Sequence, residues 1–207
     1  MILCPEVIVT QRHIVIGLTG QTGAGKSTVC SFAEKLGAAV VNADCVAREV
    51  MQPGSPCLEE LAKVFGKDIL QEDGSLKRKL LAKRAFSDKE KTELLNSISH
   101  PFITARAKAY IEKLKKEGIR IIIYDAPQLF ESGGDSLCDK VATVTAPEEV
   151  RIQRIMKRDN ISRGEAELRN SAQHDEKFFI EHSDYIIDGA REPEKVQESV
   201  RQMLAGL

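Results

Sequence analysis

Apolar residues along the chain fall into two kinds of pattern. Five short runs, rich in β-branched residues, have the length and composition of strands buried in a sheet. Between these runs, apolar residues recur every three or four positions, as on the buried face of a helix. Because strands and helices alternate, the pattern predicts a parallel sheet, covered on both faces and joined by right-handed crossovers. The predicted strands are residues 14–18, 38–41, 119–124, 140–145 and 184–188.

The interval between the second and third predicted strands is too long for a simple crossover. No convincing strand occurs in residues 51–118, and apolar residues at helical spacing predict a helical lobe there. Several basic residues of this lobe, Arg78 among them, form either a solvated face or a surface that grips an anionic substrate. The lobe helices are expected at residues 56–65, 76–86, 88–98 and 101–117.

A second insertion, residues 151–176, follows the fourth predicted strand and is rich in arginine. Arg154 and Arg158 are four residues apart and share one face of a helix expected at residues 147–158. They belong either to a charged surface helix or to a lid whose guanidinium groups close over a transferring phosphoryl group. In the next lid helix, Ser162 and Glu165 fit a capping box. The other segments would form the core of a single domain, residues 1–207; they are residues 12–50, 119–150 and 183–207.

Residues 20–27, GQTGAGKS, follow the first predicted strand and fit the phosphate-loop pattern G-x-x-x-x-G-K-[ST]. Glycines allow the tight turn and let backbone N–H groups approach phosphate oxygens. The Lys26 ammonium would reach the β- and γ-phosphates, the Ser27 hydroxyl would bind Mg²⁺, and the helix that begins here would point its positive end at the anion. We therefore expect a three-layer α/β/α P-loop NTPase fold with strand order 2-3-1-4-5. The residues expected to contact ATP in this loop are Gly20, Gly23, Ala24, Gly25, Lys26, Ser27 and Thr28.

Two carboxylates are placed at the ends of predicted strands, on the ligand side of an α/β sheet. Asp44 follows the second strand and is a candidate catalytic acid; it is also in the position of an N-cap for a helix at residues 45–51, and the two roles are compatible. Asp125 ends the third strand, as the carboxylate that contacts Mg²⁺ does in P-loop enzymes. Strands often end in aspartate, so this second pattern is weak by itself.

Composition narrows the functional classes. The chain has 207 residues, a net charge of −1 and 42% hydrophobic residues, and its apolar runs are too short to span a membrane. The near-neutral charge gives no indication of nucleic acid as a partner. Five widely spaced cysteines and no C-x-x-C predict reduced thiols and a cytoplasmic protein, without a disulfide framework or a zinc site. The N-terminal segment MILCPEVIVTQRH does not fit a signal peptide and is expected to be a short extension.

The phosphate loop alone does not separate kinases, GTPases and ATPase motors. The chain lacks the N-K-x-D sequence that reads guanine, and no glycine follows Asp125 as in a GTPase switch. A helical lobe after the second strand and an arginine-rich lid after the fourth favour a small-molecule kinase. A nucleoside monophosphate kinase or a regulatory nucleotide-binding module remains an alternative; the second would need neither an acceptor-side acid nor lid arginines.

Several longer motifs resemble the dephospho-coenzyme A kinase family over nearly the whole chain. They include IGLTGQTGAGKSTV at 16–29, VVNADCVAREVMQPGSP at 40–56 and FGKDILQEDGSLKRKLL at 65–81. Further matches are SHPFI at 99–103, DAPQLFES at 125–132 and the lid pattern QRIMKRD…LRNSAQ at 153–173. The resemblance implies that the chain transfers a phosphoryl group from ATP, with Mg²⁺, to the ribose 3′-hydroxyl of dephospho-coenzyme A.

The resemblance also implies roles for individual residues. Asp44 would be the general base for the 3′-hydroxyl, while Lys26 and the lid arginines would neutralise charge on the transferring group. Ser27 and Asp125 would hold the magnesium ion. The residues implied in contacts with the acceptor are Asp44, Arg48, Arg78 and His100, and those implied in the lid are Arg154 and Arg158.

The chain departs from the family pattern at three positions. Asn42 stands where the family usually has aspartate, which leaves the base role to Asp44. Gln128 replaces a usual leucine, and Gly189 stands where asparagine is common. If that asparagine helps to hold the nucleotide, backbone groups must replace it here.

Overall fold

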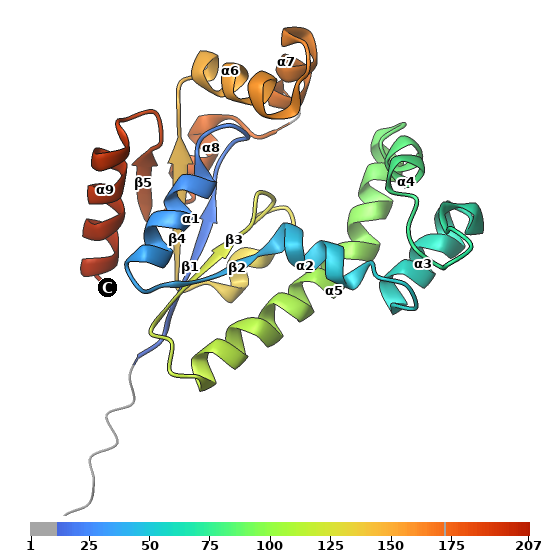
Figure 1. Cartoon of the computed structure of the whole chain (residues 1–207), viewed down its shortest axis with the longest axis horizontal. Helices are drawn as coiled ribbons and strands as arrows, with labels where there is room; N and C mark the ends of the chain where they lie inside the picture. The colour runs from blue at the N-terminus through green and yellow to red at the C-terminus, as the bar shows by residue number, and fades with distance from the viewer. Residues whose placement is uncertain (1–11, 172) are drawn as a thin grey trace, which may run out of the picture.

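The computed structural model describes residues 12–171 and 173–207, and its centre is a five-stranded sheet (Figure 1). The strand order is β2-β3-β1-β4-β5, and every neighbouring pair is parallel. The predicted order and direction are therefore confirmed. Residues 1–11, which include Cys4 and most of the expected N-terminal extension, lie outside the described residues. The strands are β1 (Ile14–Thr19), β2 (Ala39–Asn42), β3 (Ile121–Asp125), β4 (Lys140–Thr145) and β5 (Tyr185–Asp188).

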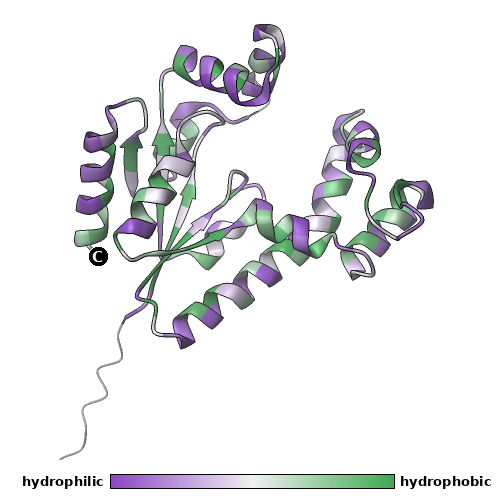
Figure 2. Cartoon of the chain, viewed as in Figure 1, coloured by the Kyte–Doolittle hydropathy of each residue, from purple (hydrophilic) through white to green (hydrophobic). Residues whose placement is uncertain are grey.

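Successive side chains of each strand point to opposite faces of the sheet, and helices cover both faces. Ile14, Ile16 and Leu18 face one layer, which contains α1 (Lys26–Lys35) and α9 (Pro193–Ala205). Val15 belongs to the core on the opposite face, with α2 (Ala43–Val50) and the second half of α5 (Lys89–Lys116). Figure 2 shows the strands largely in the green of apolar residues. The central strands β1 and β3 thus bury both faces, as their runs of apolar residues predict, whereas Ile186 of the edge strand β5 is exposed.

The helical lobe stands beside the sheet and has an apolar core of its own (Figure 1). That core includes Cys57 and Leu61 of α3, Ile69 of a short 3₁₀ helix and Leu81 of α4. It gives the lobe a separate packed centre, while α5 runs from the lobe back to the sheet. The lobe elements before α5 are α3 (Pro56–Phe65), η1 (Lys67–Ile69) and α4 (Arg78–Ala85).

The prediction of two helices at 88–98 and 101–117 is wrong, since α5 is continuous and contains Pro101. Proline lacks an N–H group and removes one backbone hydrogen bond within a helix. Residues on either side of it are nevertheless anchored: Ile98 packs against the lobe core, and Ile111 against the sheet. Packing before and after Pro101 compensates for the backbone hydrogen bond that proline removes.

The lid lies above the phosphate loop and consists of α6 (Glu148–Asp159) and α7 (Arg163–Ser171) (Figure 1). A small apolar cluster, Ile152, Ile155 and Ala166, joins the two helices. The predicted capping box is confirmed: the Glu165 carboxylate accepts from the Ser162 amide at 2.9 Å. Three short helices escaped the sequence prediction: η1, η2 (Gly134–Leu137) and α8 (Glu176–Glu181). The domain boundaries assigned to lobe and lid stay a prediction.

In the described residues, no helix is both long enough and apolar enough to cross a membrane.

Replacing Ile111 by alanine should destabilise the fold by about 2–5 kcal/mol, because a buried side chain is removed and a cavity left. Ile111 is 2% exposed and packs between α5 and the sheet. Leu94, on the same helix, is 40% exposed, and Leu94→Ala should cost much less. Urea unfolding of both variants measures the difference; equal losses would contradict the placement of α5.

Candidate active site

The phosphate loop, residues 20–27, connects the carboxyl end of β1 to the start of α1. Gly25 precedes α1 in a left-handed conformation, and no side chain among the described residues caps this helix. The first amide groups of α1 are therefore available for an anion, where the helix dipole also favours negative charge. This is the geometry that the glycine-rich sequence predicts.

Lys26 lies between the loop and two carboxylates. Its Nζ donates to the carbonyl oxygens of Gly20 at 2.5 Å and of Gln21 at 3.4 Å. Burial lowers the pKa of the Lys26 ammonium, and the charges of Asp125 and Asp44 oppose that shift. The sheet thus places a positive charge and two acids around one point, at the carboxyl ends of β1, β2 and β3.

The loop also packs against backbone of the next strand. Gly20 has a φ of +129°, and a Cβ there would lie 2.3 Å from the Val144 carbonyl oxygen of β4. An alanine at this position would require movement of the strand as well as a disfavoured backbone conformation. Glycine at position 20 is therefore needed for packing within the protein, in addition to any need for space at a phosphate.

Arg154 contacts the phosphate loop at Gly23 and Ala24. Its guanidinium donates to the carbonyl oxygens of Gly23 at 3.2 Å and Ala24 at 3.1 Å, and to that of Gly189 at 2.8 Å. Arg154 also lines the cavity next to the loop. The expected lid arginine therefore ties the phosphate loop to the turn after β5.

Arg158 lies one turn further along α6 and lines the same cavity. It forms an ion pair with Asp159, with 2.8 Å between Nε and Oδ1. This pairing, together with the more distant charge of Asp44, raises the pKa of the guanidinium. Arg158 therefore remains positively charged where it faces the acids of the site.

Asp125 is buried at the end of β3, beside the end of β2. The side-chain amide of Asn42 donates to its Oδ2 at 2.7 Å, while its Oδ1 is buried without a hydrogen-bond partner among the described residues. Burial raises the pKa of Asp125, while Lys26 and the Asn42 amide act in the opposite direction. Buried carboxylate oxygens are normally bound by a donor or a cation. The free oxygen, together with the Ser27 hydroxyl in the same cavity, suits a hard cation such as Mg²⁺.

The prediction that Asp44 caps α2 is wrong. Asn42 is the N-cap and accepts from the Cys45 amide at 2.9 Å, whereas Asp44 lies in the first turn of the helix and is exposed. The helix begins at residue 43 and not at the predicted residue 45, because asparagine is as good an N-cap as aspartate. The Asp44 carboxylate is consequently free of the capping role and faces the cavity.

A cavity of about 890 Å³ joins these groups, and we call it the main cavity. The phosphate loop, α2, the segment after β3 and the lid arginines form its polar side. His100, half-buried on α5, also lines it, whereas Arg48 and Arg78 are exposed and are not among its lining residues. A predicted contact of these two arginines with substrate stays a prediction. Lobe residues of the lining are Met51, Phe86, Leu95, Asn96, Ser99, His100 and Ile103.

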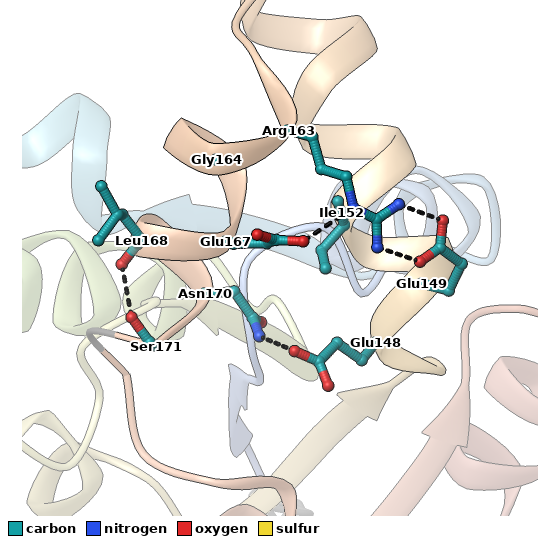
Figure 3. Close-up of a pocket in the computed structure, with 9 residues that line it drawn as sticks. All are labelled: Glu148, Glu149, Ile152, Arg163, Gly164, Glu167, Leu168, Asn170 and Ser171. Carbon is teal, nitrogen blue, oxygen red and sulfur yellow. Dashed lines mark hydrogen bonds and ion pairs between the residues drawn. The ribbon is translucent and has the colours of Figure 1, made fainter.

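A second hollow, of about 700 Å³, lies within the lid, and the described residues that line it all belong to α6 and α7. Figure 3 shows Arg163 of α7 paired with Glu149 of α6; Arg163 also pairs with Glu167 on its own helix. Arg163 is thus engaged by two carboxylates, which leaves no free positive charge for a phosphate among these lining residues, and no residue of the phosphate loop contributes to the hollow. The main cavity is therefore the candidate active site.

A model of the dephospho-CoA kinase family matches residues 14–194. The chain belongs to this family. A dephospho-CoA kinase of Corynebacterium diphtheriae is 40% identical over 189 residues, covering 91% of this chain and 94% of that protein. A crystal structure of TT1252 from Thermus thermophilus superposes with a TM-score of 0.79 at 29% identity, covering 95% of this chain and 98% of that one. The dephospho-CoA kinase from Campylobacter jejuni gives 0.69 at 27%, with 92% and 95% covered. The predicted family, fold and kinase class are confirmed.

Sequence analysis of this kinase missed the contact between the lid and the first half of the phosphate loop. The Gln173 side chain accepts from the Thr22 amide at 2.8 Å, and Gln21 donates to the His174 carbonyl at 3.0 Å. Gln173 also lines the main cavity. It ends the lid motif that matches the family, which was the only signal for it in the sequence.

The space around position 189 fits glycine but not asparagine, the residue common in the family. A Cβ at Gly189 would lie 2.1 Å from the Ala24 carbonyl oxygen and 2.8 Å from Cγ1 of Val144. The Gly189 backbone itself is engaged, since its carbonyl accepts from Arg154 and its amide donates to Thr145. Backbone groups of this turn are thus connected to the phosphate loop through Arg154. Gln128, another departure from the family pattern, lines the main cavity, and its contacts indicate no further role.

We expect Gly189→Asn to destabilise the kinase by about 1–3 kcal/mol, as overpacking in a tight site does. Because the clash is with the phosphate loop, ATP affinity should fall as well. Gly164→Asn is the matched control, since a Cβ there meets nothing within 4 Å. Calorimetric titration with ATP and thermal unfolding measure both effects. Wild-type stability and affinity in Gly189→Asn would show that the turn is not packed in this way.

Proposed function

We propose that this kinase transfers the γ-phosphoryl group of ATP to the ribose 3′-hydroxyl of dephospho-coenzyme A, giving coenzyme A and ADP. The observation that carries this proposal is the main cavity itself. It places the phosphate loop and the Asp44 carboxylate on one side and the side chains of the helical lobe on the other. A donor triphosphate and an acceptor can therefore meet at Asp44.

The donor side would bind the triphosphate through the backbone amides of the phosphate loop and the Lys26 ammonium. When bound, Mg²⁺ supplies positive charge that neutralises the phosphate oxygens. The Asp125 Oδ1 and the Ser27 hydroxyl are the groups we assign to it. Arg154 keeps the loop in shape through three carbonyl oxygens, and Arg158 adds charge from the lid side. Preorganised charges of this kind stabilise a phosphoryl-transfer transition state without reorganising during the reaction.

The acceptor side would use Asp44 as the general base. Its carboxylate is exposed to the cavity, near Lys26 and Arg158, and it is not occupied by a helix-capping bond. A carboxylate there can orient the acceptor hydroxyl and take its proton as the phosphoryl group transfers. His100 on α5 would contact the acceptor from the lobe.

Replacing Asp44 by asparagine should lower kcat by about two to four orders of magnitude, the usual contribution of a positioned base. Asparagine keeps the size of the side chain and removes the proton acceptor, so ATP affinity should change little. Glu49→Gln is the control on the same helix, because Glu49 does not line the main cavity and should leave turnover near the wild-type value. ADP release with dephospho-coenzyme A as the acceptor measures kcat.

Turnover of Asp44→Asn close to the wild-type value would exclude Asp44 as the base. Equal losses in Asp44→Asn and Glu49→Gln would instead attribute the effect to α2 as a whole.

A further inference from the structure

Asn42 and Asp125 are neighbours because their strands pair. β2 and β3 are parallel, and the register places Asn42 beside Asp125 at the carboxyl ends of the two strands. This edge of the sheet also carries Lys26 and Ser27 at the start of α1. The side chain at position 42 therefore decides what surrounds the Asp125 carboxylate.

The two ends of the Asn42 side chain have different partners. Its Oδ1 accepts from the Cys45 amide at 2.9 Å, which requires an oxygen at that position. Its Nδ2 then faces Asp125 and donates to Oδ2 at 2.7 Å. An amide performs both tasks at once. An ionised carboxylate could cap the helix but could not donate to Asp125, and it would place two negative charges in contact.

The remaining oxygen of Asp125 is the one without a partner. Asp125 is 8% exposed, and its Oδ1 has no hydrogen-bond partner among the residues described. The Cys30 thiol lies close enough to lower the pKa of this carboxylate, but a thiol is a weak donor. Leaving such an oxygen unpaired is unfavourable unless a cation binds it.

We propose that Asn42 is a positioning residue for magnesium: its amide holds one oxygen of Asp125 and leaves the other as the single carboxylate oxygen that β2 and β3 offer the cation. This inference rests on the proposed assignment of Asp125 and Ser27 to Mg²⁺. With one carboxylate oxygen and one hydroxyl, the protein would supply only two of the six oxygen ligands of Mg²⁺, and water would supply the others until phosphate oxygens arrive. Magnesium therefore binds together with the nucleotide, and the nucleotide-free enzyme has little affinity for it.

Asn42→Asp tests the proposal, because aspartate keeps the cap of α2 and replaces the donor by a second carboxylate. Calorimetric titration with MgCl₂ alone should show weak binding to the wild type. Binding to the variant should be about tenfold tighter or more, as expected when ligand charge increases at a hard-cation site. Mg²⁺ should also raise the melting temperature of the nucleotide-free variant more than that of the wild type.

Asn96→Asp is the matched control for added charge. Asn96 lines the main cavity from α5, outside the contacts of Asp125, so this variant should bind Mg²⁺ as weakly as the wild type. Tight binding of Mg²⁺ by the nucleotide-free wild type would overturn the proposal. So would equal affinities of Asn42→Asp and Asn96→Asp.

Asn42→Ser provides a second test, because serine can keep the helix cap but is too short to hold Asp125. Without that bond, Mg²⁺ should enhance ATP binding less than in the wild type, and an undiminished enhancement would contradict a positioning role. Asp125→Asn separates this inference from the assignment on which it rests. If Mg²⁺ still enhances ATP binding fully in Asp125→Asn, the assignment of Asp125 is wrong. If the enhancement is lost there but kept in Asn42→Ser, only the role of Asn42 is wrong.

Discussion

The conformation of the phosphate loop depends on backbone-to-backbone packing that leaves no space for a Cβ. Gly20 lies against the carbonyl of Val144, and Gly189 lies against the carbonyl of Ala24. Arg154 then joins both sides by donating to carbonyls of the loop and of the turn after β5. The loop is thus fixed by β4, by β5 and by the lid, so that its amide groups point in set directions before any anion binds. Such preorganisation reduces the reorganisation required during phosphoryl transfer.

The same end of the sheet collects the charged groups of the site. Parallel strands direct their carboxyl ends to one edge, and here β1 leads to Lys26, β2 to Asn42 and β3 to Asp125. The positive and negative groups compensate one another in a partly buried place, where an isolated charge would be costly. The helical lobe completes the site from the opposite side with apolar and amide side chains. The sheet therefore supplies the charges, and the lobe supplies the surface for an acceptor.

Local sequence patterns were sufficient for much of this architecture. Apolar runs located the five strands, and the glycine-rich octet located the phosphate loop. The capping box of Ser162 and Glu165 could also be predicted, because the two partners are only three positions apart. The prediction ended a helix before Pro101, but packing of Ile98 before it and of Ile111 after it outweighed the local effect of proline. Asp44 was the expected cap of α2, but Asn42, two residues earlier, takes that position.

Apart from the cap of α2, the contacts missed were those between residues far apart in the chain. The bond from the Thr22 amide to Gln173 joins positions 151 residues apart, and that from Asn42 to Asp125 joins positions 83 apart. No periodicity encodes such pairs, so they emerge only from the fold. The most direct test of the kinase function is ADP release with MgATP and dephospho-coenzyme A, measured beside AMP and shikimate. Turnover with dephospho-coenzyme A alone, and recovery of coenzyme A as the product, is the result we predict. Turnover with AMP or shikimate but not with dephospho-coenzyme A would contradict it.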